Sequence, residues 1–283
     1  MRFRTLALTT GALTAALVVA GCTSPTTPAP ASPALEDLGH VHGIVDTGDG
    51  TVLLGTHTGL YTLTEDGAVA GPVGGHDFDA MGLTRAGDVF YASGHPGPTT
   101  PPELGAPHLG VLRSTDAGRS WEPVAFTGQE DFHVLTASGA GAIYGIGSSS
   151  STVRTSPDGG ATWIDGAELP AADLAVAADG ILYAATQQGV QESRDAGATF
   201  TAVPDAPLLY MLEADPGGGV AGVDTEGSLW RLIDGSWTRL GTTTGTVQAL
   251  GATADGAIVL LDDRGIVWIR GTESTTVLPA SAS

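Results

Sequence analysis

Histidine is the residue type of this chain best suited to chemistry, and its distribution along the sequence is uneven. All seven histidines fall within residues 40–133, and residues 134–283 contain none. They are His40, His42, His57, His76, His95, His108 and His133. Neutral imidazole is the most common protein ligand for transition metals. The clustering therefore predicts a metal or small-ligand site in the first half of the chain.

The spacing of these residues ranks them as ligands. Alternate residues of a strand share a face, so His40 and His42 should lie on the same side of one strand. One position in successive repeats is occupied by His42, Met81, His133, Leu174, Tyr210 and Gln248 in turn. The most favoured ligands are therefore His42, His133 and Met81, followed by His40, His57 and His95, with His76 and His108 as weaker candidates.

The residue types also bear on which metal is bound. Imidazole with a thioether suits copper, whereas imidazole with a carboxylate suits zinc or another divalent ion. Met81 therefore favours copper, with zinc as the alternative. A proline-rich insertion at 94–110, which contains His95 and His108, has the stiffness expected of a lid. The competing interpretation is structural: the imidazoles cap turns, and the methionines fill gaps in the core.

Repeated strands must position these residues. An apolar strand, a Gly/Asp turn and a second apolar strand recur six times at intervals of about 40 residues, as is typical of a β-propeller. The sequence predicts an all-β, six-bladed β-propeller over residues 38–279. Its blades are expected at 38–75, 76–128, 129–170, 171–207, 208–245 and 246–279. Because the first strand of each blade lies innermost, equivalent positions near its start should converge at one mouth of the central channel.

Three turns share the pattern S-x-D-x-G-x-[ST]-[WF], at 114–121, 156–163 and 193–200. Their aspartates, Asp116, Asp158 and Asp195, can accept backbone N–H bonds across a hairpin turn, while glycine supplies a positive φ. These aspartates are therefore expected to be structural. The pattern closely resembles the Asp box of sialidase-like (BNR) repeats, so the strands are expected to pair through Asp-box hairpins.

The whole domain resembles secreted bacterial propellers with these repeats, which are often labelled glycosyl hydrolases. Segments such as 40–43 and 131–133 resemble a lipoprotein subgroup associated with metal resistance. A sialidase needs an arginine triad for its substrate carboxylate, and no arginine falls at the inner-strand position. Another glycoside hydrolase, with Asp79 and Asp131 as weak catalytic candidates, a glycan-binding propeller and a protein-assembly scaffold remain alternatives. We expect a binding protein rather than an enzyme.

The amino terminus indicates where the domain works. Residues 1–21 have the cationic start and short apolar run of a signal peptide, and they end in a Val-Ala-Gly-Cys segment that resembles the bacterial lipobox. The resemblance implies lipidation of Cys22 and a tether over 22–37, which is rich in Pro, Thr and Ser. We therefore expect a lipid-anchored protein on the extracytoplasmic face of the cell membrane, with a membrane protein as a partner if metal is delivered.

The amino-acid composition restricts the classes of molecule that the protein is expected to bind. The chain has 31 acidic and 11 basic residues and a formal net charge of −20, which argues against nucleic acid as a partner. Cys22 is the only cysteine, so the folded domain has neither a disulfide nor a thiolate metal ligand.

Overall fold

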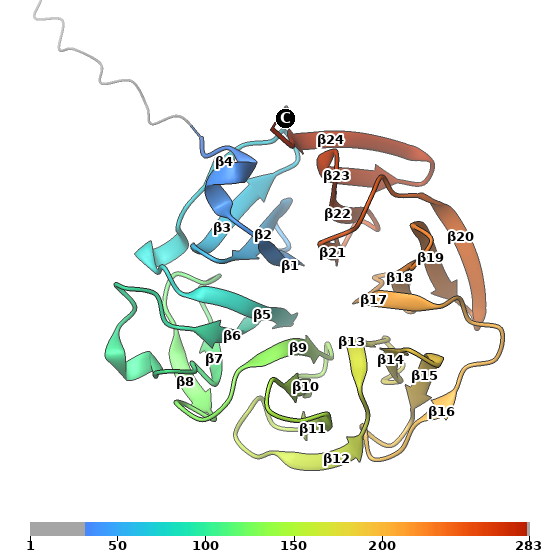
Figure 1. Cartoon of the computed structure of the whole chain (residues 1–283), viewed down its shortest axis with the longest axis horizontal. Coiled ribbons are helices and arrows are strands. Elements are labelled where there is room, and N and C mark those ends of the chain that lie inside the picture. The colour runs from blue at the N-terminus through green and yellow to red at the C-terminus, as the bar shows by residue number, and fades with distance from the viewer. Residues whose placement is uncertain (1–31, 282–283) are drawn as a thin grey trace, which may run out of the picture. The chain divides into compact units, whose positions relative to one another are not determined.

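A computed structural model describes residues 32–281, which form six four-stranded antiparallel sheets arranged around a central axis (Figure 1). The predicted all-β, six-bladed β-propeller is thus confirmed. The predicted signal peptide, Cys22 and residues 22–31 of the predicted tether lie outside the described residues. No helix in the described part of the chain is long and apolar enough to cross a membrane.

Each blade is built from four consecutive strands, and in each the first strand lies nearest the axis (Figure 1). The first three blades are β1 (Val41–Asp46), β2 (Thr51–Thr56), β3 (Gly59–Thr64) and β4 (Val69–Ala70); β5 (Asp79–Ala86), β6 (Val89–His95), β7 (Val111–Ser114) and β8 (Glu122–Ala125); and β9 (Phe132–Ala137), β10 (Ile143–Gly147), β11 (Thr152–Ser156) and β12 (Ile164–Glu168).

The last three blades follow the same order. They are β13 (Ala171–Val176), β14 (Leu182–Thr186), β15 (Gly189–Ser193) and β16 (Thr201–Ala202); β17 (Leu209–Ala214), β18 (Val220–Asp224), β19 (Ser228–Ile233) and β20 (Ser236–Thr242); and β21 (Ala249–Ala252), β22 (Ile258–Asp262), β23 (Gly265–Arg270) and β24 (Glu273–Pro279). Three short 3-10 helices, η1 (Leu35–Leu38), η2 (Val73–Gly75) and η3 (Pro102–Leu104), precede or interrupt the first two blades.

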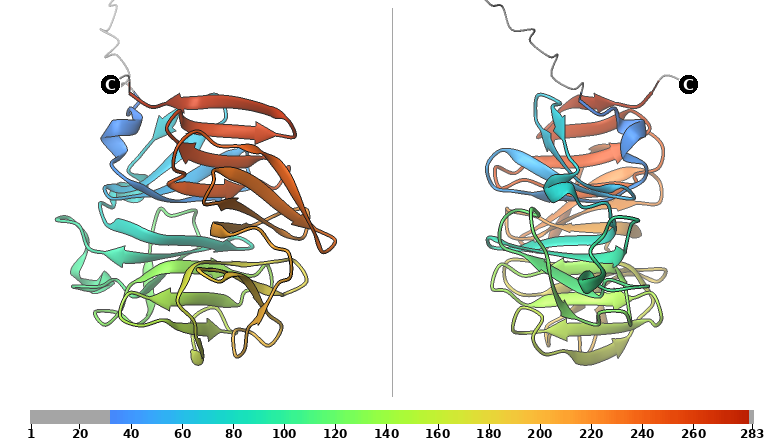
Figure 2. Two further views of the ribbon diagram at one scale, coloured as in Figure 1. Left: turned by 45° about the vertical axis from the view of Figure 1, so that its right-hand side comes forward. Right: turned by 90° about the vertical axis from the view of Figure 1, so that its left-hand side faces the viewer.

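Apolar side chains between neighbouring sheets form the core and also close the ring. Ile44 and Leu54 of the first blade are buried in one cluster with Val259 and Trp268 of the last blade. These two sheets are stacked in the side views (Figure 2). Neither blade borrows a strand from the other. The ring is therefore closed by side-chain packing, to which burial of apolar surface contributes roughly 25 cal/mol per Å².

The three Ser-Asp turns share one hydrogen-bond pattern. In the second of them, the Ser156 hydroxyl accepts the backbone N–H of Gly160 at 2.7 Å and donates to Asp158 at 2.9 Å. Asp158 also accepts the backbone N–H of Thr162 at 2.8 Å. Gly160 has a φ of 100°, which residues with a side chain rarely adopt. The same bonds recur at 114–120 and 193–199. The turn aspartates are thus occupied by backbone bonds far from the channel axis.

Five inner strands carry a β-bulge at the same place near their start. The bulged residues, which have no partner on the neighbouring strand, are His42, Met81, His133, Ala172 and Tyr210. The sequence-based alignment was wrong in the fourth blade, where the equivalent residue is Ala172 and not Leu174. Leu174 instead pairs with Ala184 and is buried. Leu174 lies two residues after Ala172, so the period-two alternation of a strand does not distinguish these two positions.

Candidate metal centre

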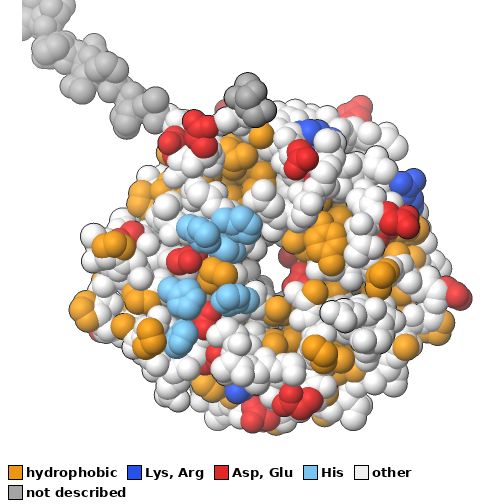
Figure 3. Space-filling view, viewed as in Figure 1, with side chains coloured by type: hydrophobic (Ala, Val, Ile, Leu, Met, Phe, Trp, Pro, Cys, Tyr) orange, Lys and Arg blue, Asp and Glu red, His pale blue; other side chains and the backbone are white. Residues whose placement is uncertain are grey.

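Histidine side chains gather on one face of the ring, beside the central opening (Figure 3). They form two groups in which potential ligand atoms lie within 4.8 Å of one another. The first, called here the His40 group, contains His40, His42 and His57. The second, called here the Asp131 group, contains His95, Asp131 and His133, and His108 also contacts Asp131.

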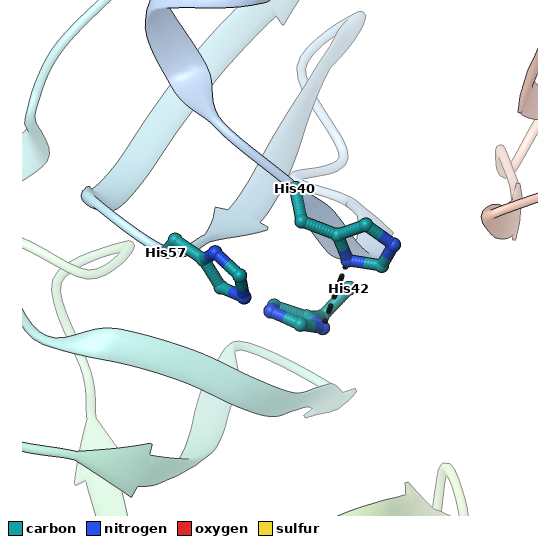
Figure 4. Close-up of side chains that lie close together, drawn as sticks. All are labelled: His40, His42 and His57. Atoms are coloured by element: carbon teal, nitrogen blue, oxygen red, sulfur yellow. Dashed lines mark hydrogen bonds between the residues drawn. The ribbon is translucent and has the colours of Figure 1, made fainter.

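The first blade alone supplies the His40 group. His40 precedes β1, His42 is the bulged residue of β1, and His57 follows β2. The backbone N–H of His57 donates to the His40 carbonyl at 3.1 Å, which holds the two segments together. The ring of His42 lies 4.6 Å from that of His40 and 4.6 Å from that of His57, centroid to centroid (Figure 4). Three imidazoles therefore converge with no carboxylate among them.

The spacing of these nitrogens fits a metal ion. His40 Nδ1 and His42 Nδ1 are 3.3 Å apart. Two ligands bound at about 2.0–2.1 Å in tetrahedral geometry lie about 3.4 Å apart. His42 Nε2 is buried without a hydrogen-bond partner among the described residues, although Asp79 Oδ1 lies 3.4 Å away and is itself unpartnered. The described chain therefore leaves one ring nitrogen of His42 and one oxygen of Asp79 without a hydrogen bond.

Burial and neighbouring charge keep His42 in the form that binds metals. Burial, followed by the charges of His40, His57 and His133, lowers the pKa of His42 to about 4. A neutral imidazole has a free lone pair, whereas an imidazolium has none. His42 is therefore ready to coordinate at neutral pH without first losing a proton.

Three segments of the chain meet at the Asp131 group. His95 ends β6, His108 lies in the insertion, and Asp131 and His133 flank the first residue of β9. Asp131 Oδ2 lies 2.6 Å from His133 Nε2 and 3.3 Å from His95 Nε2. Asp131 Oδ1 lies 3.0 Å from His108 Nδ1. The Asp131 side chain is only 1% exposed, so a buried carboxylate faces three imidazoles.

Asp131 is ionised despite its burial. Burial acts to raise its pKa, but the hydrogen bond from the Ser148 hydroxyl and the charges of His133 and His95 outweigh this effect and hold the pKa below its usual range. Ser148, which donates this bond, was not among the site residues predicted from the sequence. It lies in a run of four serines, 148–151, and no sequence signal distinguishes it from the other three.

Asp79 and Met81 lie between the two groups, because β5 is placed between β1 and β9 in the ring (Figure 1). Asp79 pairs across the sheet with His95 of the Asp131 group, and its carboxylate approaches His42 of the His40 group. Burial raises the pKa of Asp79, and the neighbouring histidines only partly offset this. Met81 is the half-buried bulged residue of β5. The three most favoured ligands, His42, Met81 and His133, are thus divided among neighbouring blades.

His76 lies apart from both groups. Its Nε2 is 3.2 Å from the carbonyl of Arg119, and its ring packs near Phe78. The insertion at 94–110 is tied to the second blade rather than hanging free over the channel. Its Thr99 N–H donates to Asp77 at 2.8 Å, and Leu104 is buried in the blade core. The insertion therefore serves to place His108 against Asp131.

Arginine contributes to neither group. Seven arginines of the described chain form ion pairs with acidic residues of strands and turns elsewhere: Arg85, Arg113, Arg154, Arg194, Arg231, Arg264 and Arg270. The histidine face therefore offers imidazoles and carboxylates, without a cationic cluster for an anionic sugar.

Comparison with known proteins supports the fold alone. No family model matches this sequence, and no curated protein is similar to it in sequence. Among solved structures, virginiamycin B lyase from Staphylococcus aureus has a TM-score of 0.55 at 16% identity, over 84% of each chain. The gluconolactonase XC5397 from Xanthomonas campestris has a TM-score of 0.59 at 17% identity, over 81% of this chain and 85% of that one. A GH74 enzyme from Niastella koreensis has a TM-score of 0.57 at 15% identity, over 84% of this chain and 45% of that one.

Proposed function

We propose that this protein binds a transition metal through histidines at one mouth of the propeller channel, with copper favoured and zinc as the alternative. The observation that carries the proposal is the His40 group, in which three imidazoles converge within ligand distance. Structural histidines need a hydrogen-bond partner when buried, and His42 Nε2 has none among the described residues. A bound ion would use these lone pairs.

The ligand type supports copper over other divalent ions. Nitrogen sites bind first-row divalent metals with affinities that peak at copper. Met81 lies on the strand beside the His40 group, and a thioether adds preference for the reduced ion. Zinc accepts the same imidazoles in tetrahedral geometry, so selectivity rests on the fourth ligand.

The proposed role is sequestration or delivery of the metal outside the cytoplasm. It includes the expected signal peptide at 1–21, lipid attachment at Cys22 and a tether that ends at the propeller. In that setting the Asp-box turns are structural, and a membrane protein is the expected recipient of delivered metal. Both groups lie at the surface, where such a partner has access to the ion. In the His40 group His40 and His57 are exposed, and in the Asp131 group the side chains of His133 and His95 are 47% and 40% exposed.

Metal competition on the purified full chain tests the proposal. The chain, kept in a mild detergent and stripped with a chelator, is titrated with Cu(I) and Cu(II) against indicators of known affinity. The double variant His40→Gln/His57→Gln should lose affinity by about 10- to 100-fold or more, because it removes two ligands. His76→Gln is the matched control, since this histidine lies outside both groups. Equal affinity in the parent and the double variant would refute copper binding at the His40 group.

The two alternative functions, glycoside hydrolysis and scaffolding, predict different results in an activity assay and a partner-binding assay on the same variants. A glycoside hydrolase built on Asp79 and Asp131 would cleave a glycoside and would lose that activity in Asp79→Asn while keeping its metal affinity. A scaffold would bind a protein partner equally well before and after metal removal. Neither alternative needs three convergent imidazoles.

A further inference from the structure

Asp131 is a buried carboxylate without a full cationic partner. The adjacent Glu130, which is also buried, has one: Arg154 Nη1 lies 3.2 Å from its carboxylate. In the described part of the chain no arginine pairs with Asp131, and the sequence contains no lysine. A buried charge is costly unless an opposite charge compensates it. A cation bound at this carboxylate would supply a full opposite charge.

The distances around Asp131 match those between ligands of one ion. His95 Nε2 lies 3.3 Å from Asp131 Oδ2, the oxygen that His133 also contacts, whereas His108 Nδ1 lies 3.0 Å from the other oxygen, Oδ1. The ligand atoms of His95, Asp131 and His133 all lie within 4.8 Å of one another. Ligands of a tetrahedral ion with bonds of about 2.0–2.1 Å are separated by about 3.4 Å. The 2.6 Å contact of His133 is shorter and is a hydrogen bond. Its side chain is 47% exposed, so the ring has room to rotate by the small amount required.

His108 supplies a second, independent observation. Its Nδ1 is buried and 3.0 Å from Asp131 Oδ1, yet it forms no hydrogen bond within the described chain. The two atoms are close, but they are not aligned as a donor and an acceptor. The Asp131 group is therefore flanked by a buried nitrogen that the described chain leaves without a hydrogen bond.

We infer that His95, His133 and Asp131 form a second metal site, separate from the His40 group, which takes a divalent first-row cation such as Zn²⁺, with His108 held against the other oxygen of the carboxylate. This inference extends the proposed function, because it assigns an ion to the second group at the same mouth. The two sites differ in their ligands: the His40 group consists of imidazoles, with Asp79 near His42 only, whereas the Asp131 group includes a carboxylate. When the ion binds through His133 Nε2, the proton on this nitrogen passes to solvent and Nδ1 of the same ring takes up a proton in its place, so the ring stays neutral.

The site also accounts for the insertion at 94–110. This segment is anchored through Asp77 and Leu104, and it carries His108 to a carboxylate that belongs to the next blade. An insertion that bridges two blades to hold an imidazole against this carboxylate has a reason to be rigid. Because the ligands come from two blades, the site also depends on the folded ring.

Zinc stoichiometry tests the inference. The full chain in detergent, freed of metal with a chelator, is dialysed against Zn²⁺, and bound zinc is measured by elemental analysis. His108→Gln/His133→Gln removes the ligand His133 and the imidazole held against the other carboxylate oxygen. These side chains are 47% and 30% exposed, so the fold should tolerate the change better than one at buried Asp131. The matched variants are His40→Gln/His57→Gln and His76→Gln. Circular dichroism and thermal unfolding verify that each variant is folded.

We expect two zinc ions per parent chain and per His76→Gln chain, and one per chain of either double variant. Co²⁺ loaded into His40→Gln/His57→Gln should show the intense visible absorption of a four-coordinate ion. If His108→Gln/His133→Gln binds as much zinc as the parent, the second site is refuted while the His40 group stands. If instead only His40→Gln/His57→Gln is unchanged, the proposed function fails at the His40 group and the second site stands. The parent could instead bind a single ion that is lost only in His40→Gln/His57→Gln. That result would show that the Asp131 group is an imidazolium–carboxylate cluster, and it would overturn the inference.

Discussion

Acidification should destabilise the metal-free protein through His42. Burial, and then the charges of His40, His57 and His133, lower its pKa from 6.5 to about 4. Between these values the unfolded chain binds a proton at this side chain that the folded chain does not bind. Acid therefore stabilises the unfolded state. The contribution of His42 is complete above the unfolded pKa and is lost as the pH falls toward the folded one.

The expected loss follows from the size of the shift. One pKa unit corresponds to about 1.4 kcal/mol, so the full effect is about 3 kcal/mol, of which about 2 kcal/mol is reached at pH 5. The His42 side chain is only 12% exposed, so solvent screens this effect little. Many carboxylates also titrate in this range, and only the difference between parent and variant isolates His42.

Urea unfolding followed by tryptophan fluorescence measures this difference. The parent, His42→Gln and the control His76→Gln are compared at pH 7 and pH 5, with a chelator present throughout. The unfolding free energy of the parent should fall by about 2 kcal/mol more than that of His42→Gln, and His76→Gln should follow the parent. Equal losses in the parent and His42→Gln would show that His42 is not buried beside the other imidazoles, and the described geometry of the His40 group would be wrong.

Three further predictions concern the scaffold. Ser156→Ala should lower the unfolding free energy by about 1–3 kcal/mol in urea titrations, because it leaves a buried turn N–H unpaired, and unchanged stability would contradict the structural role of the Asp-box turn. Gly82→Ala would place a Cβ 2.4 Å from a backbone carbonyl of the next blade, so it should lower the melting temperature, whereas Gly139→Ala, which meets nothing within 4 Å, should not. Burial, and then the nearby charge of Asp173, raise the pKa of Glu213, so the folded protein favours the protonated side chain and loses stability as the pH rises. Glu213→Gln cannot titrate and should therefore lose less thermal stability than the parent between pH 5 and pH 8. Identical losses in the two proteins would refute this prediction.

The mouth of a propeller brings side chains from separate repeats together for a simple geometric reason. Inner strands of neighbouring blades begin at the same end of the channel, so side chains from separate repeats meet there without any long-range pairing of their backbones. The β-bulges of β1, β5 and β9 bring one extra residue per blade to this position, and a bulge redirects the side chain that it carries. Ligands can thus change from blade to blade while the sheets stay the same.

Local patterns in the sequence were sufficient to predict the propeller. Alternating apolar strands separated by glycine-rich turns specify four-stranded sheets, and six such units at a regular interval specify a ring, because each sheet buries its faces only against its neighbours. The Ser-Asp turns are equally local, since every bond of the turn at 156–162 joins residues at most four positions apart. The uneven distribution of histidine likewise pointed to one mouth of the channel.

The grouping of the ligands was decided only by the tertiary structure. The sequence ranked His42 and His133 together, but the ring divides them between two groups, and it joins His108 to Asp131 across 23 residues of chain. The fourth-blade register was also misassigned, because Ala172 and Leu174 are two residues apart and the alternation of a strand does not distinguish such positions. Which imidazole meets which carboxylate depends on how far each blade rotates relative to the next. That rotation is set by the packing of many side chains between sheets, and no local pattern encodes it.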